Sequence, residues 1–150
     1  NHLRLAMAEA FSLGGALGRA GRGREALQHT QESLRLNPSS AKAQVNHGIG
    51  LLELGRAQEA VRHFEHAIEL EPDYVSAHSN LGIAYCQMGR LREGVRHLRD
   101  ALELDPDCVE AHFNLAIALR ELGHPQEAQH HYREAVRIDP RYVSPGGGGN

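Results

Sequence analysis

The chain has 150 residues, with 16 lysines and arginines against 19 aspartates and glutamates and a formal net charge of −3. Acidic and basic residues are interspersed, which argues against the basic patch or stripe of a nucleic-acid-binding protein. Its apolar runs fall far short of the roughly 20 residues that span a bilayer. We therefore expect neither nucleic acid nor membrane as a partner.

Two cysteines, Cys86 and Cys108, are too few and too unpatterned for a disulfide framework or a zinc site. They favour a reducing, cytoplasmic compartment. The chain opens on Asn1 and shows no secretory signal, so we expect it to be a segment of a longer protein.

Prolines recur at an interval of 34 residues, at Pro38, Pro72, Pro106 and Pro140. A glycine keeps the same interval at Gly21, Gly55, Gly89 and Gly123, and a small residue follows five positions later at Ala26, Ala60, Gly94 and Ala128. A fixed period of this size is the signature of a repeat protein, in which each unit stacks on its neighbours.

In chain order, we expect a lead-in at 1–6, unit 1 at 7–40, unit 2 at 41–74, unit 3 at 75–108, unit 4 at 109–142, and a flexible glycine-rich tail at 143–150. Apolar stripes with 3–4 spacing predict two helices of about 12–14 residues in each unit. In unit 3, Gly89 should end the first helix in the left-handed conformation. Pro106 suits the first turn of the following helix.

Small residues mark where the two helices of a unit approach each other. Gly48 and Gly82 on the first helices permit a short interaxial distance, as do second-helix alanines such as Ala101. An acidic residue precedes the small residue of each unit and favours the dipole of the second helix's first turn; these residues are Glu25, Glu59, Glu93 and Glu127.

Unit 1 departs most from this pattern. Several glycines raise the cost of its first helix, and Thr30 and Ser33 replace the expected aromatic residue and alanine. We expect this unit to be degenerate and to fray. No capping helix follows unit 4, so we expect its apolar edge to be exposed unless more protein continues.

The units resemble the tetratricopeptide repeat family, whose loose pattern is Trp-Leu-Gly-Tyr-Ala-Phe-Ala-Pro. Unit 3 carries it at Leu81, Gly82, Tyr85, Gly94, Leu98, Ala101 and Pro106. The tryptophan position holds Gln44, His78 and His112 instead. The resemblance covers 7–142 and implies an all-α, right-handed superhelical solenoid of antiparallel helix pairs, whose first helices line a concave groove that binds a peptide or a partner's helix.

The resemblance also implies the groove positions of each unit. They give the candidate peptide-binding residues Lys42, Val45, Asn46, Ile49, Glu53, Ser79, Asn80, Ile83, Gln87, Glu110, Phe113, Asn114, Ile117 and Arg120.

Among these positions, an asparagine recurs once per unit, at Asn46, Asn80 and Asn114. A primary amide can pair with a peptide's N–H and C=O, so a ladder of amides would hold an extended chain largely independently of its side chains. This ladder is similar to that of O-linked N-acetylglucosamine transferases. The alternative is a structural role, in which the amides bond between neighbouring first helices. The carboxylate clamp of relatives that bind chaperone tails lacks its lysines and arginine here.

Histidines recur on the second helices at His29, His63, His97 and His131. Equivalent residues of stacked helices lie roughly 10 Å apart, whereas each ligand of one zinc ion lies about 2 Å from it. We expect packing histidines and no functional metal, although His63 and His66 lie one turn apart and could hold an ion weakly. No nucleophile, base and orienting acid fall together, and we expect neither catalysis nor a cofactor.

These observations predict a protein–protein interaction scaffold that binds an extended segment in its groove. One alternative is the non-catalytic, substrate-recruiting arm of a larger enzyme, such as a glycosyltransferase that resembles those with the asparagine ladder. A third reading is a spacer, or self-association through the uncapped edge of unit 4.

Overall fold

The computed structural model describes residues 19–143, and the lead-in, most of the first helix of unit 1 and most of the tail lie outside this range. The described residues form α2 (Arg19–Leu36), α3 (Ala41–Glu53), α4 (Ala57–Leu70), α5 (Val75–Gln87), α6 (Leu91–Leu104), α7 (Val109–Glu121), α8 (Pro125–Ile138) and the 3₁₀ helix η1 (Pro140–Tyr142). The described part is all-α, as predicted. None of its helices is long and apolar enough to cross a bilayer.

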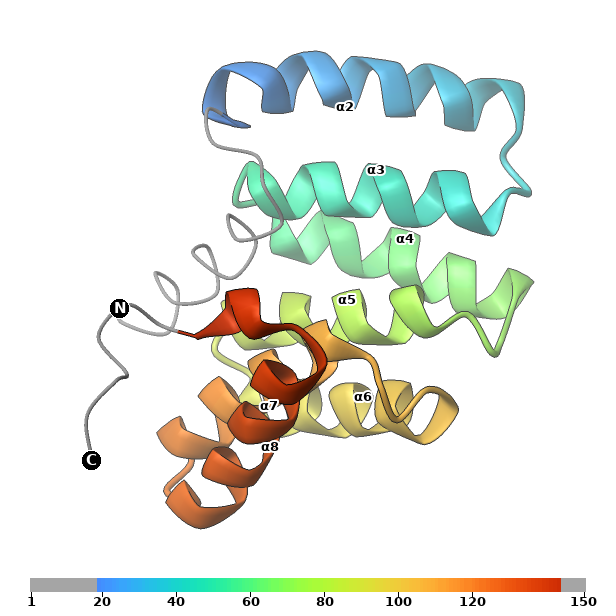
Figure 1. The fold of residues 1–150 in the computed structure, drawn as a ribbon. Helices are drawn as coiled ribbons and strands as arrows, with labels where there is room; N and C mark the ends of the chain where they lie inside the picture. Colours follow the sequence, from blue (N-terminus) through green and yellow to red (C-terminus); the bar gives the residue numbers. More distant parts are fainter. Residues whose placement is uncertain (1–18, 144–150) are drawn as a thin grey trace.

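The helices stack in chain order as consecutive antiparallel pairs, α3 with α4, α5 with α6 and α7 with α8 (Figure 1). Each second helix also packs on the first helix of the following pair. In addition, α5 contacts both α3 and α7 directly. The stack turns along its length, so that α7 and α8 run in a clearly different direction from α2 and α3 (Figure 1). This arrangement places the first helices side by side in one layer.

Glycines end the first helices, as predicted. Gly55, Gly89 and Gly123 have φ values of 76°, 81° and 88°, which a residue with a Cβ adopts only with strain. The amide of Arg90 donates to Tyr85 O (2.9 Å), and the equivalent bonds recur at Arg56 and His124. This left-handed turn leads the chain directly into the second helix of each pair.

The second helices present their apolar stripes to the core. Leu98 and Ala101 are fully buried in α6, and Phe64 is fully buried in α4. Gly48 faces Phe64, where an added Cβ would lie 2.5 Å from Phe64 Cε1. The prediction that glycine permits close approach within a pair is therefore confirmed.

The structure corrects three details of the sequence analysis. Helix α2 is 18 residues long and runs through Gly21, so this glycine does not end a helix. As a result, Glu25 lies beyond the first turn of α2, unlike Glu59, Glu93 and Glu127 in their helices. Pro106 lies in the turn before α7, where Cys108 N donates to Asp105 O, and not in the first turn of that helix.

The end of unit 4 is partly covered by the chain itself. Helix η1 places the ring of Tyr142 against Phe113 of α7, with 4.9 Å between ring centroids, and Tyr142 is 7% exposed. Asp139 caps η1 by accepting from Arg141 N. The expected exposed apolar edge is thus reduced by three residues that follow α8.

Candidate functional site

The candidate groove residues fall into three groups by burial on α3, α5 and α7. The chain itself buries Val45, Ser79, Asn80, Ile83 and Asn114. The half-buried residues are Ile49, Gln87, Phe113 and Ile117. The exposed residues are Lys42, Asn46, Glu53, Glu110 and Arg120. A partner on this face would therefore contact chiefly the last two groups.

Two of the three ladder asparagines bond to their own helix. The amide nitrogen of Asn80 donates to Ser76 O, and that of Asn114 donates to Glu110 O, each at 2.8 Å. These bonds run within one helix and not between neighbouring first helices. They fix the amide orientation, because each NH₂ group donates to a carbonyl one turn earlier in the same helix.

The carbonyl oxygen of Asn114 is buried and has no hydrogen-bond partner among the described residues. Asn114 as a whole is 3% exposed, Asn80 is 9% exposed, and Asn46 is exposed. The ladder is therefore graded, from an exposed amide in unit 2 to a buried one in unit 4. A buried acceptor without a donor calls for an explanation, such as an ordered water or a donor supplied by a partner.

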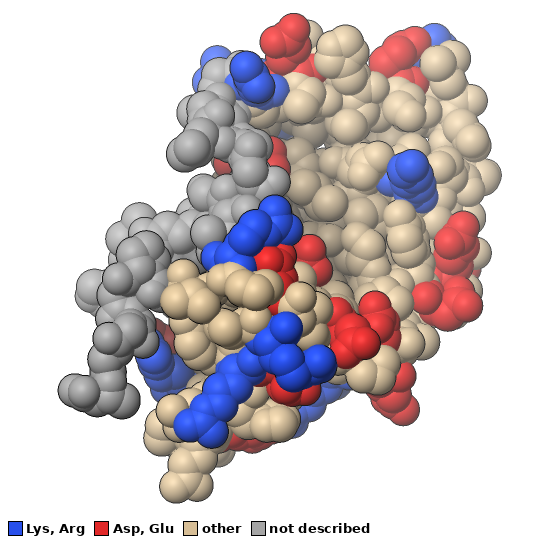
Figure 2. All heavy atoms as spheres, viewed as in Figure 1, with Lys and Arg blue, Asp and Glu red and all other residues tan. Residues whose placement is uncertain are grey.

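The surface of this face is uncharged over wide areas but exposes the charged residues Lys42, Glu53, Glu110 and Arg120. Figure 2 shows mostly uncharged surface over α3 and α5, with scattered acidic and basic side chains. Much of the remaining charge is paired on the second helices, where Arg56 contacts Glu59 (2.6 Å) and Arg90 contacts Glu93 (2.6 Å). Arg99 of α6 contacts Glu127 of α8 (2.7 Å) and links two units. Exposed pairs of this kind contribute little to stability.

A second polar arrangement recurs at the tryptophan position of the repeat. Its side chain bonds to the carbonyl of the proline six residues earlier, from Gln44 Nε2 to Pro38 O (3.0 Å), from His78 Nε2 to Pro72 O (2.8 Å) and from His112 Nε2 to Pro106 O (2.7 Å). In units 2 and 4 the other polar atom of this side chain bonds to a histidine of the second helix in the same pair, whereas Nδ1 of His78 in unit 3 has no hydrogen-bond partner among the described residues. In units 2 and 4 the departure from tryptophan thus builds a polar link between the proline turn and both helices.

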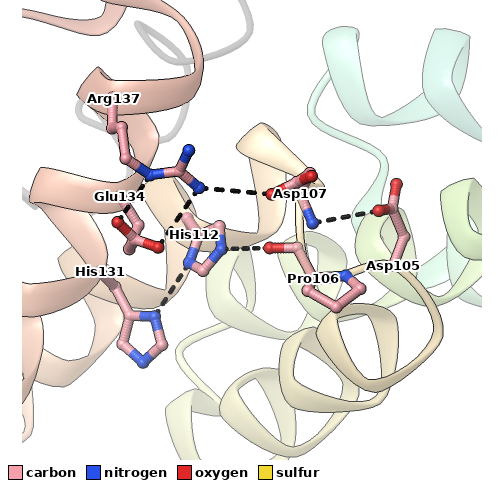
Figure 3. Close-up of polar contacts among 7 residues, drawn as sticks. All are labelled: Asp105, Pro106, Asp107, His112, His131, Glu134 and Arg137. Carbon is pink, nitrogen blue, oxygen red and sulfur yellow. Dashed lines mark hydrogen bonds and ion pairs between the residues drawn. The ribbon is translucent and has the colours of Figure 1, made fainter.

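In unit 4 this link is a pair of histidines (Figure 3). The Nδ1 atoms of His112 and His131 lie 3.0 Å apart. Since Nε2 of His112 donates to Pro106 O, its Nδ1 is an acceptor and His131 Nδ1 carries the proton. Burial, followed by repulsion from His112, lowers the pKa of His131. Nearby, Glu134 is held by Arg137, which also reaches Asp107.

In unit 2 the same position holds an amide. Gln44 Oε1 accepts from His63 Nδ1 at 2.9 Å, and the ring of His47 stands edge-on to His63 at 4.7 Å. Burial is the largest cause that lowers the pKa of both histidines, and for His47 the charge of His63 comes next. These residues therefore favour the neutral form in the folded chain.

Sequence reasoning did not find this pairing. The sequence analysis compared histidines at the same position of different units. The contact instead joins a first-helix residue to a second-helix residue of the same unit. The signal was present, because His78 and His112 lie 19 residues before His97 and His131. Recognising it required the antiparallel alignment of the two helices in a pair.

The cysteines lie in the core. Burial raises the pKa of the Cys86 thiol to about 12, and it also raises the pKa of Cys108. A thiol of this kind is almost entirely protonated at neutral pH and is a poor nucleophile and metal ligand. Gly94 of α6 gives Cys86 its space, because an added Cβ would overlap its sulfur.

Comparison with known families agrees with this architecture. A model described as "Tetratricopeptide repeat" matches residues 73–141, and one described as "TPR repeat" matches residues 50–89. The chain is a tetratricopeptide repeat protein. Proteins of this family typically mediate protein–protein interactions. No curated protein sequence matches the chain.

Solved structures share the fold. A crystal structure of MamA superposes with a TM-score of 0.68 at 21% identity, covering 81% of this chain and 71% of MamA. Residues 41-end of MamA from Desulfovibrio magneticus RS-1 give 0.69 at 21% identity, with 93% and 76% covered. YrrB, described as a TPR protein with an unusual peptide-binding site, gives 0.67 at 21% identity, with 81% and 62% covered. At this identity the likeness establishes the fold.

Proposed function

We propose that the chain is a non-catalytic interaction module that holds an extended segment of a partner protein along α3, α5 and α7. One observation carries the proposal, namely the buried carbonyl oxygen of Asn114 with no hydrogen-bond partner in the described part of the chain. An unpaired buried acceptor costs about 1–3 kcal/mol. This oxygen is closed to solvent in the described structure, so a partner N–H would reach it as neighbouring side chains move apart. The new bond would remove that cost, which favours binding.

The spacing of the ladder favours one backbone conformation in the partner. Equivalent residues in successive units lie roughly 10 Å apart. A polyproline II chain rises about 9 Å in each three-residue turn and makes no internal hydrogen bonds. Every third N–H of such a segment would then face Asn46, Asn80 or Asn114. The amides act as acceptors, because the NH₂ groups of Asn80 and Asn114 are already bonded to their own helices.

Side chains beside the ladder provide further contact. Ile49 and Ile117 are half-buried and offer apolar surface, while Lys42, Arg120 and Glu110 place both signs of charge around it. We infer that affinity comes mainly from backbone hydrogen bonds and apolar contact, and that net charge selects partners weakly. The structurally similar YrrB is described as having an unusual peptide-binding site, which supports this class of function.

The test combines a protein variant with a backbone change in the ligand. Peptides selected from a random library on the full chain are titrated by fluorescence anisotropy against wild type and Asn114→Ala. We expect Asn114→Ala to weaken binding about 2- to 10-fold, which is the net value of one hydrogen bond. Each peptide N–H is then replaced in turn by N-methyl.

One N-methyl position should weaken binding to wild type and have no further effect on Asn114→Ala, because both changes remove the same bond. Gln129→Ala on the exposed face of α8 serves as the matched control. Additive effects at every N-methyl position would show that Asn114 does not accept from the ligand. Lowered stability of Asn114→Ala with unchanged affinity would assign Asn114 a structural role.

A further inference from the structure

One polar group in unit 3 combines the residue types of a metal site. Side-chain ligand atoms of His78 in α5 and of His97 and Asp100 in α6 all lie within 4.8 Å of one another. Nδ1 of His97 is 3.7 Å from an oxygen of Asp100. Two imidazoles and a carboxylate suit Zn²⁺ and its first-row neighbours. A tetrahedral zinc ion with bonds of about 2 Å holds its ligands about 3.3 Å apart, so small movements close the site.

Each of the two imidazoles has one ring nitrogen that makes no hydrogen bond to the described residues. Nδ1 of His78 and Nδ1 of His97 are both buried and lack a hydrogen-bond partner among the described residues. His78 donates from Nε2 to Pro72 O at 2.8 Å, so its Nδ1 carries a lone pair. A backbone carbonyl that accepts from the far nitrogen is the usual outer contact of a metal-bound histidine.

The rings are held in place before any ion binds. His97 stacks on Tyr85, with 5.4 Å between ring centroids and 10° between ring planes. The guanidinium of Arg90 lies over the Tyr85 ring, 4.9 Å from its centroid. Such support fixes ligand orientation. His97 has a side-chain exposure of 15% and Asp100 of 45%, which leaves a path from solvent.

Unit 4 provides an internal comparison, because it also holds two histidines and a carboxylate at the same register, namely His112, His131 and Glu134. There the imidazoles bond to each other at 3.0 Å, and Arg137 holds the carboxylate (Figure 3). The residue of unit 3 that corresponds to Arg137 is Glu103. The carboxylate of Asp100 therefore has no equivalent arginine to hold it.

We propose that His78, His97 and Asp100 form a binding site for one divalent transition-metal ion of the Zn²⁺ type, which joins α5 to α6. The fourth position is open to water. One neighbouring group opposes binding, since the guanidinium of Arg96 lies 3.3 Å from Nε2 of His97. That nitrogen must carry the proton when Nδ1 binds the ion, so exposed Arg96 turns toward solvent. Arg96→Gln should therefore strengthen binding.

The test is a titration of the metal-free full chain with Zn²⁺ by calorimetry, together with thermal unfolding with and without the ion. We expect one ion per chain and a higher melting temperature on binding. His78→Gln copies Gln44, which keeps the bond to the proline carbonyl in unit 2, so this variant should fold. It should lose at least about tenfold in affinity, as should Asp100→Asn.

His112→Gln is the matched control and should bind Zn²⁺ like wild type. If His112→Gln loses the ion and His78→Gln keeps it, the ion lies in unit 4 and the proposal is wrong. Weak uptake of several ions that neither variant changes would assign binding to scattered surface histidines and would equally overturn it. Visible absorption of the Co²⁺-loaded chain, present in wild type and absent in His78→Gln, would support the assigned ligands.

Discussion

Gly82 of α5 lies directly against Leu98 of α6, and a Cβ on Gly82 would be 2.7 Å from Leu98 Cγ and 2.8 Å from the carbonyl oxygen of Gly94. Leu98 is fully buried, and the Gly94 oxygen belongs to the backbone. Neither can move without displacing the helix. The pair α5–α6 therefore approaches as closely as its glycines allow.

The first prediction is that Gly82→Ala destabilises the chain. Alanine gains about 1 kcal/mol of helix propensity over glycine, whereas overpacking costs about 1–3 kcal/mol. Since the contact includes backbone, we expect the clash to dominate, with a net loss of up to about 2 kcal/mol in urea unfolding. Ala116→Gly tests the equivalent position of unit 4 and should lose only propensity. A more stable Gly82→Ala would show that the pair can widen freely.

The second prediction concerns Ala101, which is fully buried on α6. Ala101→Trp adds an indole to a filled space and should lower the free energy of unfolding by roughly 1–3 kcal/mol. Arg92→Trp, at an exposed position of the same helix, controls for the new aromatic group. An unchanged melting temperature for Ala101→Trp would contradict the packing described for this helix.

Much of this fold was predictable from local rules. The period of 34, the left-handed glycines and the apolar stripes each follow from one residue type at one position, and they correctly indicated helix pairs from α3 onward. Side-chain partners were less predictable. The bond from Asn114 to Glu110 O depends on a rotamer, and the approach of His78 to His97 depends on how two helices align, neither of which a linear pattern contains. Gly21 shows that a local rule can also fail, because this glycine stands at the repeat position where the other units end a helix, yet α2 continues through it.

The third prediction is that acidification destabilises the chain between about pH 8 and 5.5. Burial lowers the pKa of His47 and of His63, so the unfolded chain binds more protons than the folded one near the ordinary pKa of about 6.5. The contribution of these two histidines to the free energy of unfolding is therefore fully present above that pKa. It is lost as the pH falls from there through the lowered pKa values of the folded chain. Urea unfolding at pH 8 and 5.5, with a chelator present, measures the effect.

His63→Gln should reduce this pH dependence, while Gln129→Ala, which changes an exposed residue without an ionisable group, should leave it unchanged. Exposed carboxylates such as Glu59, whose pKa is lowered by its bond to Arg56, titrate below this window. Equal or greater stability at pH 5.5 would show that the buried histidines do not control the response.

The fourth prediction is that both thiols are inert in the folded chain. Burial raises the pKa of Cys86 to about 12 and also raises that of Cys108, and the thiolate is the reactive form. Ellman's reagent at pH 8 should react with neither thiol until urea unfolds the chain, and with two thiols afterwards. Cys108→Ala isolates Cys86, which is 1% exposed. Rapid labelling of that variant in native buffer would contradict the burial.

The fifth prediction concerns the cover that Tyr142 places on Phe113. Removing a buried aromatic side chain costs about 3–5 kcal/mol in a closed core. Because η1 has only three residues and lies at the end of unit 4, we expect the lower part of that range for Tyr142→Ala. The change also exposes the ring of Phe113, which Tyr142 contacts at 4.9 Å.

An exposed aromatic edge at the end of a solenoid favours stacking with a second copy. We therefore expect Tyr142→Ala to self-associate more strongly than wild type in sedimentation velocity at matched concentrations, and Tyr142→Phe to behave like wild type. Arg141→Ala changes an exposed neighbour and should alter neither property. If Tyr142→Ala stays monomeric while its unfolding midpoint falls, then Tyr142 supports unit 4 but does not shield it from other copies.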